Sequence, residues 1–209
     1  DSVASRGLGD VYKRQDLKKA CLICNEGEYP ICEKCYSEFE RANTINSIDF
    51  IDELEVIFRY MGILKKYMSK LKFEKIYGYL DFFYDIIKKE CSFENIDGII
   101  YIPSDFIRQL KRGFNVSYEL SKRISVDYGI PLYDILKKSM PTKPSHTMTG
   151  FKRASFDHGI KVKEPVKTGR YIILDDVITT GKTLSDAGKA IKFSNDEVYL
   201  KAVSYTHLT

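Results

Sequence analysis

The stretch that decides the fold is GRYIILDDVITTGKTL, residues 169–184. Its residues 171–174 are apolar and rich in side chains that favour β-structure, which predicts a short buried strand. Asp175 and Asp176 follow directly, then a loop of Thr and Gly, then residues 184–191 with the apolar spacing of a helix. A buried parallel strand delivers its following loop to the carboxyl edge of the sheet, where α/β proteins bind ligands. This order of elements therefore predicts a site for a phosphorylated sugar.

The loop and the start of the helix carry groups suited to a phosphate. Free backbone N–H groups at a helix start attract an anion, and the helix dipole favours negative charge there. Gly181 lets the backbone approach a ligand closely. Donor hydroxyls come from Thr179, Thr180 and Thr183. The two adjacent carboxylates suit ribose hydroxyls instead, or the Mg²⁺ that accompanies a pyrophosphate.

Two other interpretations of this stretch are weaker. Gly181-Lys182-Thr183 looks like the end of a nucleotide-binding P-loop, but that motif requires a Gly five residues before its second Gly, and Asp176 stands there. A plain surface turn with two solvated acids would make the whole order of elements accidental. Neither interpretation accounts for the full stretch.

The stretch resembles the signature by which type I phosphoribosyltransferases bind phosphoribosyl pyrophosphate (PRPP): an apolar strand, two acids, an apolar pair and Thr-Thr-Gly-x-Thr. The resemblance implies that Asp175 and Asp176 hold the ribose hydroxyls of PRPP, and that Mg²⁺ binds together with PRPP. It also implies that the 5′-phosphate is wrapped by Thr179, Thr180, Gly181, Lys182 and Thr183.

Four of the five cysteines form two CxxC pairs separated by seven residues, namely Cys21 and Cys24, then Cys32 and Cys35. This spacing predicts a tetrahedral Cys₄ zinc site on two knuckles. A thioredoxin-type redox pair is the alternative, but it requires one CxxC on a βαβ unit. A closed Cys₄ site has no open position for chemistry, so we expect a structural role, and we expect chelation to unfold this segment while leaving the core sheet. Cys91 is predicted to be a small buried hydrophobe.

The composition is that of a globular protein. The 209 residues, 44% of them apolar, suffice for one medium domain or a domain with a small module. A net charge of +4 permits anionic ligands or nucleic acid without requiring them. No apolar run approaches the ~18 residues of a membrane span and no secretory signal is visible, so we expect a cytoplasmic protein. Residues 1–15 and 204–209 break the pattern of their neighbours, and we expect them to be non-native or a disordered arm, outside the fold.

Strand and helix patterns alternate along the chain, which predicts an α/β fold with a parallel sheet. Strands are expected at 53–60, 96–103, 130–136 and 197–203, with a return to the sheet at 159–162. Helices are expected at 63–73, 74–90 and 116–126, with a linker helix and loop at 37–49. The predicted organisation is a zinc ribbon at 16–45, a strand-helix linking segment at 46–95 and a phosphoribosyltransferase core at 96–203.

A basic group follows the strand at 96–103. Arg108, Lys111 and Arg112 crowd the carboxyl end of this strand, where a pyrophosphate would need cations. Together with Ser104 they are candidates for the pyrophosphate side of the site. A solvated basic loop is the alternative.

The segment 137–158 is long, polar and contains proline, and loops of that length are usually functional or disordered. In type I phosphoribosyltransferases the matching loop closes over PRPP and shields the reaction from water. The resemblance therefore makes Lys143, His146, Lys152 and Arg153 candidate loop ligands, with His146 a candidate acid or base.

A narrower resemblance covers residues 21–203. The two CxxC pairs, an apolar strand ending at Pro103, the sequence RGFN at 112–115 and the PRPP signature together resemble the ComF family of predicted phosphoribosyltransferases. That family is tied to DNA uptake and natural transformation in bacteria. The chain departs from the family pattern at Val116, where Gln is frequent, and at Phe156, where the long loop usually has Asn.

Three functions remain as hypotheses. In the first, a nucleophile displaces pyrophosphate from PRPP through an oxocarbenium-like state, and the protein positions the reactants and stabilises charge. In the second, single-stranded DNA or an uptake or recombination partner contacts the ribbon and the basic groups. Lys65 and Lys66 would then supply charge, and bases would stack on Tyr67, Tyr77 and Tyr79 if these are exposed. In the third, the chain senses PRPP without turnover.

Overall fold

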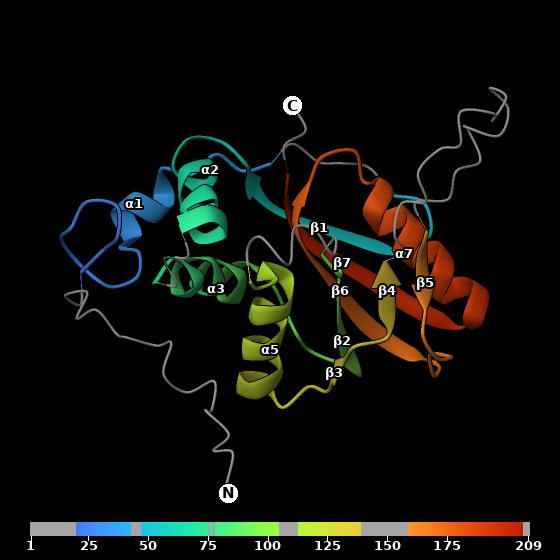
Figure 1. Ribbon diagram of the computed structural model, residues 1–209. Coiled ribbons are helices and arrows are strands. Elements are labelled where there is room, and N and C mark those ends of the chain that lie inside the picture. Colours follow the sequence, from blue (N-terminus) through green and yellow to red (C-terminus); the bar gives the residue numbers. More distant parts are fainter. Residues whose placement is uncertain are drawn as a thin grey trace, which may run out of the picture.

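The computed structural model describes residues 20–42, 47–74, 76, 78–104, 113–138 and 159–206. Its centre is a five-stranded sheet in which neighbouring strands run parallel, in the order β1-β7-β6-β2-β3 (Figure 1). The strands are β1 (Glu53–Arg59), β2 (Gly98–Tyr101), β3 (Leu132–Tyr133), β6 (Gly169–Ile178) and β7 (Val198–Thr206). The predicted α/β class with a parallel sheet is thereby confirmed.

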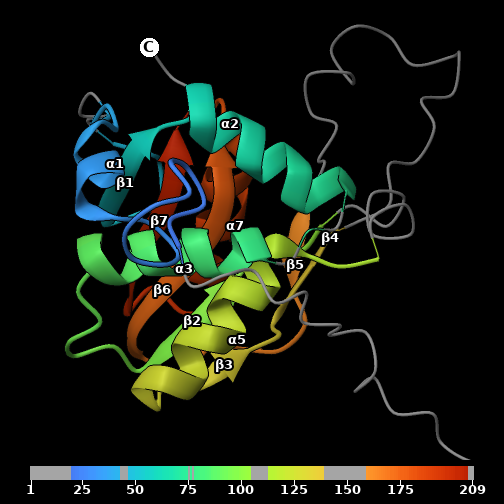
Figure 2. The same ribbon diagram turned by 90° about the vertical axis from the view of Figure 1, so that its left-hand side faces the viewer.

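Helices cover both faces of the sheet. One face carries α2 (Gly62–Ser69), the π-helical turn η2 (Lys70–Glu74), α3 (Gly78–Glu90) and α5 (Val116–Tyr128). Figure 2 looks onto this face. The other face carries α7 (Lys182–Ser194) and a two-stranded antiparallel sheet of β4 (Leu136–Lys138) and β5 (Ile160–Val162). The central strands are therefore buried on both sides, as the continuous apolar run at 171–174 requires.

Strand β6 divides its side chains between the two faces. Ile172 and Leu174 pack into the apolar cluster under α2, α3 and α5, whereas Tyr171 and Ile173 pack into the cluster under α7. Ile172 and Ile173 are fully buried. This alternation is the ordinary pleat of a strand, and it determines which layer the residues at the end of β6 can reach.

Several element boundaries differ from the sequence-based expectation. Strand β7 continues to Thr206 instead of ending at Val203, because Tyr205 fits into the core: it is 1% exposed and its hydroxyl donates to the carbonyl of Phe83. The expectation that the fold ends before residue 204 is wrong for this part of the tail. Strand β5 does not return to the main sheet but pairs with β4. The linker helix expected at 37–49 is instead the short α1 (Glu33–Ser37) within the described residues.

The segment 46–95, expected to link two modules, contributes directly to the sheet. β1 lies at the sheet edge beside β7, with Glu53 opposite Lys201 and Glu55 opposite Val203. The helices that follow β1 then supply most of the apolar layer on one face, with Phe82, Phe83 and Leu80 fully buried.

The segment that carries the four cysteines, residues 21–35 (the cysteine segment), packs against this helical layer. Cys21, Ile31 and Cys35 belong to the same apolar cluster as the sheet residues Ile172 and Leu174. The segment is therefore continuous with the core, and the expectation of a ribbon that unfolds by itself does not fit this packing.

Hydrogen bonds fasten the same segment to two helices. Tyr67 of α2 donates to the carbonyl of Leu22, and Tyr29 donates to the carboxylate of Asp81 on α3. Tyr67 is 5% exposed and its ring lies 4.3 Å from that of Tyr79, measured between centroids. Tyr67 is thus a core residue in a satisfied hydrogen bond, and it offers no face on which a base could stack.

Candidate functional site

The acidic pair lies where β6 loses its regular pairing with β7. The register between these strands shifts between Leu174 and Val177, so Asp175 and Asp176 occupy an irregularity of the β-bulge type. Such irregularities re-aim side chains and are frequent near active sites. The flanking Leu174 and Val177 both pack toward α2, α3 and α5, and Ile178 toward α7.

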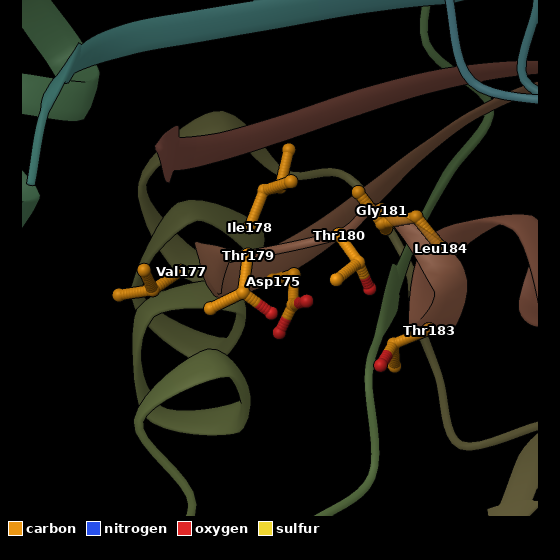
Figure 3. A pocket seen from close by; sticks show the side chains of 8 residues that line it. All are labelled: Asp175, Val177, Ile178, Thr179, Thr180, Gly181, Thr183 and Leu184. Atoms are coloured by element: carbon orange, nitrogen blue, oxygen red, sulfur yellow. The ribbon is translucent and has the colours of Figure 1, made fainter. Parts of the chain in front are cut away.

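The two acids consequently have different surroundings. Asp175 lines a small hollow at the carboxyl end of β6 (Figure 3). Asp176 does not line this hollow; its carboxylate forms an ion pair with the ammonium group of Lys72 in η2. The two carboxylates, which were predicted to act together, therefore have different neighbours in this structure.

The hollow combines one carboxylate with several hydroxyls. In Figure 3 the hydroxyls of Thr179, Thr180 and Thr183 lie around one space together with the carboxylate of Asp175. Its remaining lining residues are Val177, Ile178, Gly181 and Leu184. A single space thus offers acceptors for sugar hydroxyls beside donors for a phosphate.

The start of α7 supplies backbone donors. Its N-cap residue, Gly181, has a φ of 73° and provides no capping side chain, and the first N–H of the helix, that of Lys182, donates to the hydroxyl of Thr180 over 3.4 Å. The N–H groups that follow in the first turn can donate to an anion. A Cβ at Gly181 would strain this left-handed backbone and would come within 3.1 Å of the Cδ1 atom of Ile48. Ile48, which sequence reasoning missed, is the buried support of the loop.

Lys182 belongs to the loop sequence but points to a different partner. Its ammonium group lies 3.2 Å from the carboxylate of Asp186, one turn along α7, and its side chain is 63% exposed. In this structure Lys182 is therefore at the rim and not in the hollow.

The charge of Asp175 is poorly stabilised. Burial and the neighbouring Asp176 carboxylate raise the pKa of Asp175 to about 7, although the Asp176 N–H, Lys72 and Lys138 act in the opposite direction. The backbone N–H of Asp176 donates to the Asp175 carboxylate over 2.9 Å. Raised carboxyl pKa values of this kind are typical of functional sites.

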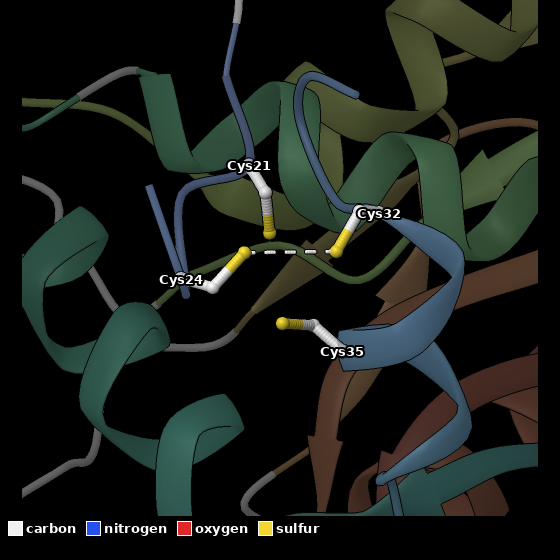
Figure 4. A group of neighbouring side chains, drawn as sticks. All are labelled: Cys21, Cys24, Cys32 and Cys35. Carbon is white, nitrogen blue, oxygen red and sulfur yellow. Dashed lines mark hydrogen bonds between the residues drawn. The ribbon is translucent and has the colours of Figure 1, made fainter. Parts of the chain in front are cut away.

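A second candidate site is the four-cysteine cluster. The Sγ atoms of Cys21, Cys24, Cys32 and Cys35 all lie within 4.8 Å of one another (Figure 4). The Cys24 and Cys32 sulfurs are 3.7 Å apart. Two thiolates of a tetrahedral zinc site, each about 2.3 Å from the metal, stand roughly 3.8 Å apart. The cluster therefore has the dimensions to hold a zinc ion.

The thiol pKa values in the cluster are pushed apart. Burial opposes ionisation of Cys21, but hydrogen bonds from the backbone of Cys32, Cys24 and Ile23 outweigh it and lower its pKa to about 6. Burial and the neighbouring sulfurs raise the pKa of Cys35. Four thiolates in this cluster would repel one another, and a divalent cation would remove that repulsion.

The chain is similar in sequence to a known protein. Competence protein F of Haemophilus influenzae is 25% identical over 185 residues, which cover 78% of this chain and 79% of that protein. The chain is similar to Competence protein F. The resemblance to the ComF family is confirmed by this match together with the four-cysteine cluster. No family model matches the chain.

Among solved structures, the chain has weak matches to adenine phosphoribosyltransferases. The Leishmania donovani enzyme has a TM-score of 0.39 at 13% identity and covers 67% of this chain and 70% of its own. The Leishmania tarentolae enzyme has a TM-score of 0.36 at 12% identity, with 64% and 70% covered. Neither match bears on function. Among the described residues no helix is long and apolar enough to cross a membrane.

The RGFN sequence of this ComF-like chain has a visible structural role at its last residue. Asn115 caps α5 by accepting a hydrogen bond from the N–H of Tyr118, and its amide donates to the carbonyl of Ile102 over 2.9 Å. Asn115 therefore ties the end of β2 to α5, close to Ser104, which is half-buried.

The other predicted site residues lie outside the described residues. These are the pyrophosphate-side candidates Arg108, Lys111 and Arg112, and the loop candidates Lys143, His146, Lys152 and Arg153. Tyr77, proposed as a stacking residue, also lies outside them. Of the predicted binding residues, the structure brings together Asp175, Thr179, Thr180, Gly181 and Thr183.

Proposed function

We propose that this ComF-like chain binds PRPP at the carboxyl end of β6 and acts as a phosphoribosyltransferase. The observation that carries the proposal is the hollow in which Asp175 and three threonine hydroxyls lie at the start of α7. The carboxylate accepts hydrogen bonds from sugar hydroxyls, and the hydroxyls and backbone N–H groups donate to the 5′-phosphate. The hollow thus offers partners both for the ribose hydroxyls and for the 5′-phosphate of a ribose 5-phosphate.

The proposed reaction is displacement at the anomeric carbon. The bond from that carbon to the pyrophosphate oxygen breaks, a bond to the acceptor's nucleophile forms, and pyrophosphate leaves with its electron pair. The chain positions the sugar and stabilises charge, as Asp175 is placed to do beside an electron-poor ribose. Mg²⁺ would accompany the pyrophosphate and neutralise part of its charge. The acceptor is expected to supply the nucleophile.

The cellular role that we propose is in DNA uptake during natural transformation. The support for this role is the similarity to Competence protein F, which extends over most of both chains. The four-cysteine cluster is proposed to hold a structural zinc ion, since it is closed by four thiols and fits the metal in size. PRPP sensing without turnover would use the same hollow and differs in that no pyrophosphate is released.

The test is calorimetric titration of the full chain with PRPP in the presence of Mg²⁺. Asp175→Asn is expected to weaken binding at least tenfold, because an ionised acceptor for two ribose hydroxyls is lost. Thr183→Val is expected to weaken binding of ribose 5-phosphate and PRPP alike. Asp196→Asn, at an exposed position after α7, is the matched control and should bind normally. Normal binding by Asp175→Asn would place the PRPP site elsewhere.

Single-stranded DNA binding is a second candidate function. Lys65 and Lys66 are exposed on α2 and could neutralise phosphates, but the buried Tyr67 removes one of the three stacking residues first considered. Fluorescence anisotropy with a labelled oligonucleotide at low and physiological salt tests this candidate. Unchanged affinity in Lys65→Glu/Lys66→Glu would exclude α2 as the binding surface.

A further inference from the structure

A lysine from the helical layer reaches the acidic pair. After α2 the chain widens into the π-helical turn η2, in which Leu71 is fully buried and Lys72 extends to the carboxylate of Asp176. The Lys72 and Asp176 side chains are 11% and 24% exposed, so their ion pair is largely withdrawn from water. π-Helical turns are rare in proteins overall, but those that occur often lie at functional sites. Such a turn shifts a side chain relative to its position on an α-helix.

The ion pair between Lys72 and Asp176 reduces the repulsion between the acidic pair and an anionic ligand. A phosphorylated sugar is an anion, and two neighbouring uncompensated carboxylates would repel it. Lys72 compensates Asp176, which leaves Asp175 as the carboxylate that faces the hollow. Where water is partly excluded, it screens charges less, so the ion pair has a stronger electrostatic effect on neighbouring groups.

We infer that Lys72 is a built-in counter-ion of the acidic pair: it holds Asp176 away from the ligand and keeps free divalent cations from binding to the two carboxylates. Lys72 is a positioning residue in this assignment, because it acts through Asp176. The inference has one consequence for the free chain and one for the liganded chain. The second consequence rests on the proposed PRPP site.

The first experiment measures Mn²⁺ binding to the free chain, purified without chelator, by electron paramagnetic resonance of unbound Mn²⁺. Mn²⁺ prefers carboxylate oxygens and therefore reports on the acidic pair rather than on the cysteines. Lys72→Met exposes both carboxylates and should bind Mn²⁺ at least tenfold more tightly than the parent chain. Lys72→Arg keeps the charge and should behave as the parent. Lys65→Met, at an exposed position on α2, is the control for the loss of one lysine.

A double variant locates the new binding. Lys72→Met/Asp176→Asn lacks one carboxylate and should lose the Mn²⁺ affinity that Lys72→Met gained. Circular dichroism shows whether the variants are folded, and Lys72→Gln replaces the Met variant if the latter unfolds, since it keeps a donor for Asp176. Equal Mn²⁺ affinity of parent, Lys72→Met and Lys72→Gln would overturn the inference.

The second experiment measures PRPP binding by calorimetry without Mg²⁺ and with millimolar Mg²⁺. Lys72→Met should bind PRPP at least tenfold more weakly than the parent without Mg²⁺, and the difference should shrink when Mg²⁺ supplies the missing charge. PRPP binding by Lys72→Met that is as tight as or tighter than that of the parent, without Mg²⁺, would overturn the inference. A loss of the same size at both Mg²⁺ levels would do so too, because it would indicate a structural role.

The two experiments separate the inference from the proposed function. A parent chain that binds no PRPP under any condition refutes the proposed function, and the Mn²⁺ titration of the free chain then decides the role of Lys72. A parent chain that binds PRPP, with a Lys72→Met variant unchanged in both titrations, keeps the proposed function and refutes the counter-ion.

Discussion

Replacement of Asp175 by Asn is expected to stabilise the fold while it weakens ligand binding. Burial and the Asp176 carboxylate raise the pKa of Asp175 to about 7 from an ordinary value of 3.8. The folded chain therefore holds a proton at Asp175 more tightly than the unfolded chain does. Above the folded pKa the carboxylate is ionised in an unfavourable place, and Asn avoids this cost because it is neutral.

The sign and size of the effect depend on pH. An acid whose pKa is raised by folding destabilises the fold progressively as pH rises from about 4 to about 7, and its effect is nearly absent below about 4. With the two pKa values given above, the cost is about 2 kcal/mol at pH 5 and about 4 kcal/mol at pH 8. The Asn variant should therefore gain roughly 2 to 3 kcal/mol relative to the parent between these two pH values.

The measurement is urea unfolding followed by circular dichroism at pH 5 and pH 8, for the parent and for Asp175→Asn. The free energy of unfolding of each chain depends on many groups, but their contributions cancel in the difference. Asp196→Asn, at an exposed position, is the control and should show little pH-dependent difference. A difference between Asp175→Asn and the parent that is the same at both pH values would refute the proposed environment of Asp175.

Three further predictions concern the parts of the fold that support the site. Elemental analysis of the chain, never exposed to chelator, should find one zinc per molecule. Chelation should lower the thermal stability of the whole chain, since Cys21 and Cys35 share the core cluster with the sheet, and an unchanged melting temperature after metal removal would contradict this. Gly188→Ala should destabilise the fold by about 1–3 kcal/mol in urea unfolding, because the new Cβ would lie 2.6 Å from the carbonyl oxygen of Phe50; a neutral effect would show that the 47–52 loop moves freely. Asn115→Ala should lower the free energy of unfolding by about 1–3 kcal/mol in the same assay, because its buried hydrogen bonds are lost. A loss below about 0.5 kcal/mol, the size of an ordinary surface change, would indicate that β2 and α5 are held by apolar contacts.

Local patterns were sufficient to predict the central strand and the composition of the loop. The apolar run at 171–174 and the Thr/Gly sequence after it depend on neighbours along the chain. The structure confirms a strand at the apolar run, although β6 continues through the two acids to Ile178, and it places the Thr/Gly sequence between β6 and α7. The spacing of the four cysteines likewise predicted their cluster: the first CxxC pair spans a turn at residues 22–24, and the second begins α1. Burial of Cys91 was also predicted correctly from its isolation in the sequence.

The separation of the two acids could not be predicted from the sequence. It depends on a register shift between β6 and β7 and on the position of η2, which are determined by pairing and packing between distant segments. The helix expected at 63–73 assumes α-helical spacing through residue 73, and that spacing gives no reason to connect Lys72 with the acidic pair. The π-helical turn changes that spacing, and the side chain reaches Asp176.

One continuous layer connects the cysteine cluster to the acidic pair. The carbonyl of Leu22, within the first CxxC pair, accepts a hydrogen bond from Tyr67 of α2, and the chain continues from α2 into η2, where Lys72 pairs with Asp176. The stretch formed by α2 and η2 is held relative to the sheet by two residues: the buried Tyr67 in α2 and the ion-paired Lys72 in η2. The cysteine segment therefore contributes to the placement of the proposed counter-ion, because it supports the helix that carries it, although none of its residues lines the hollow.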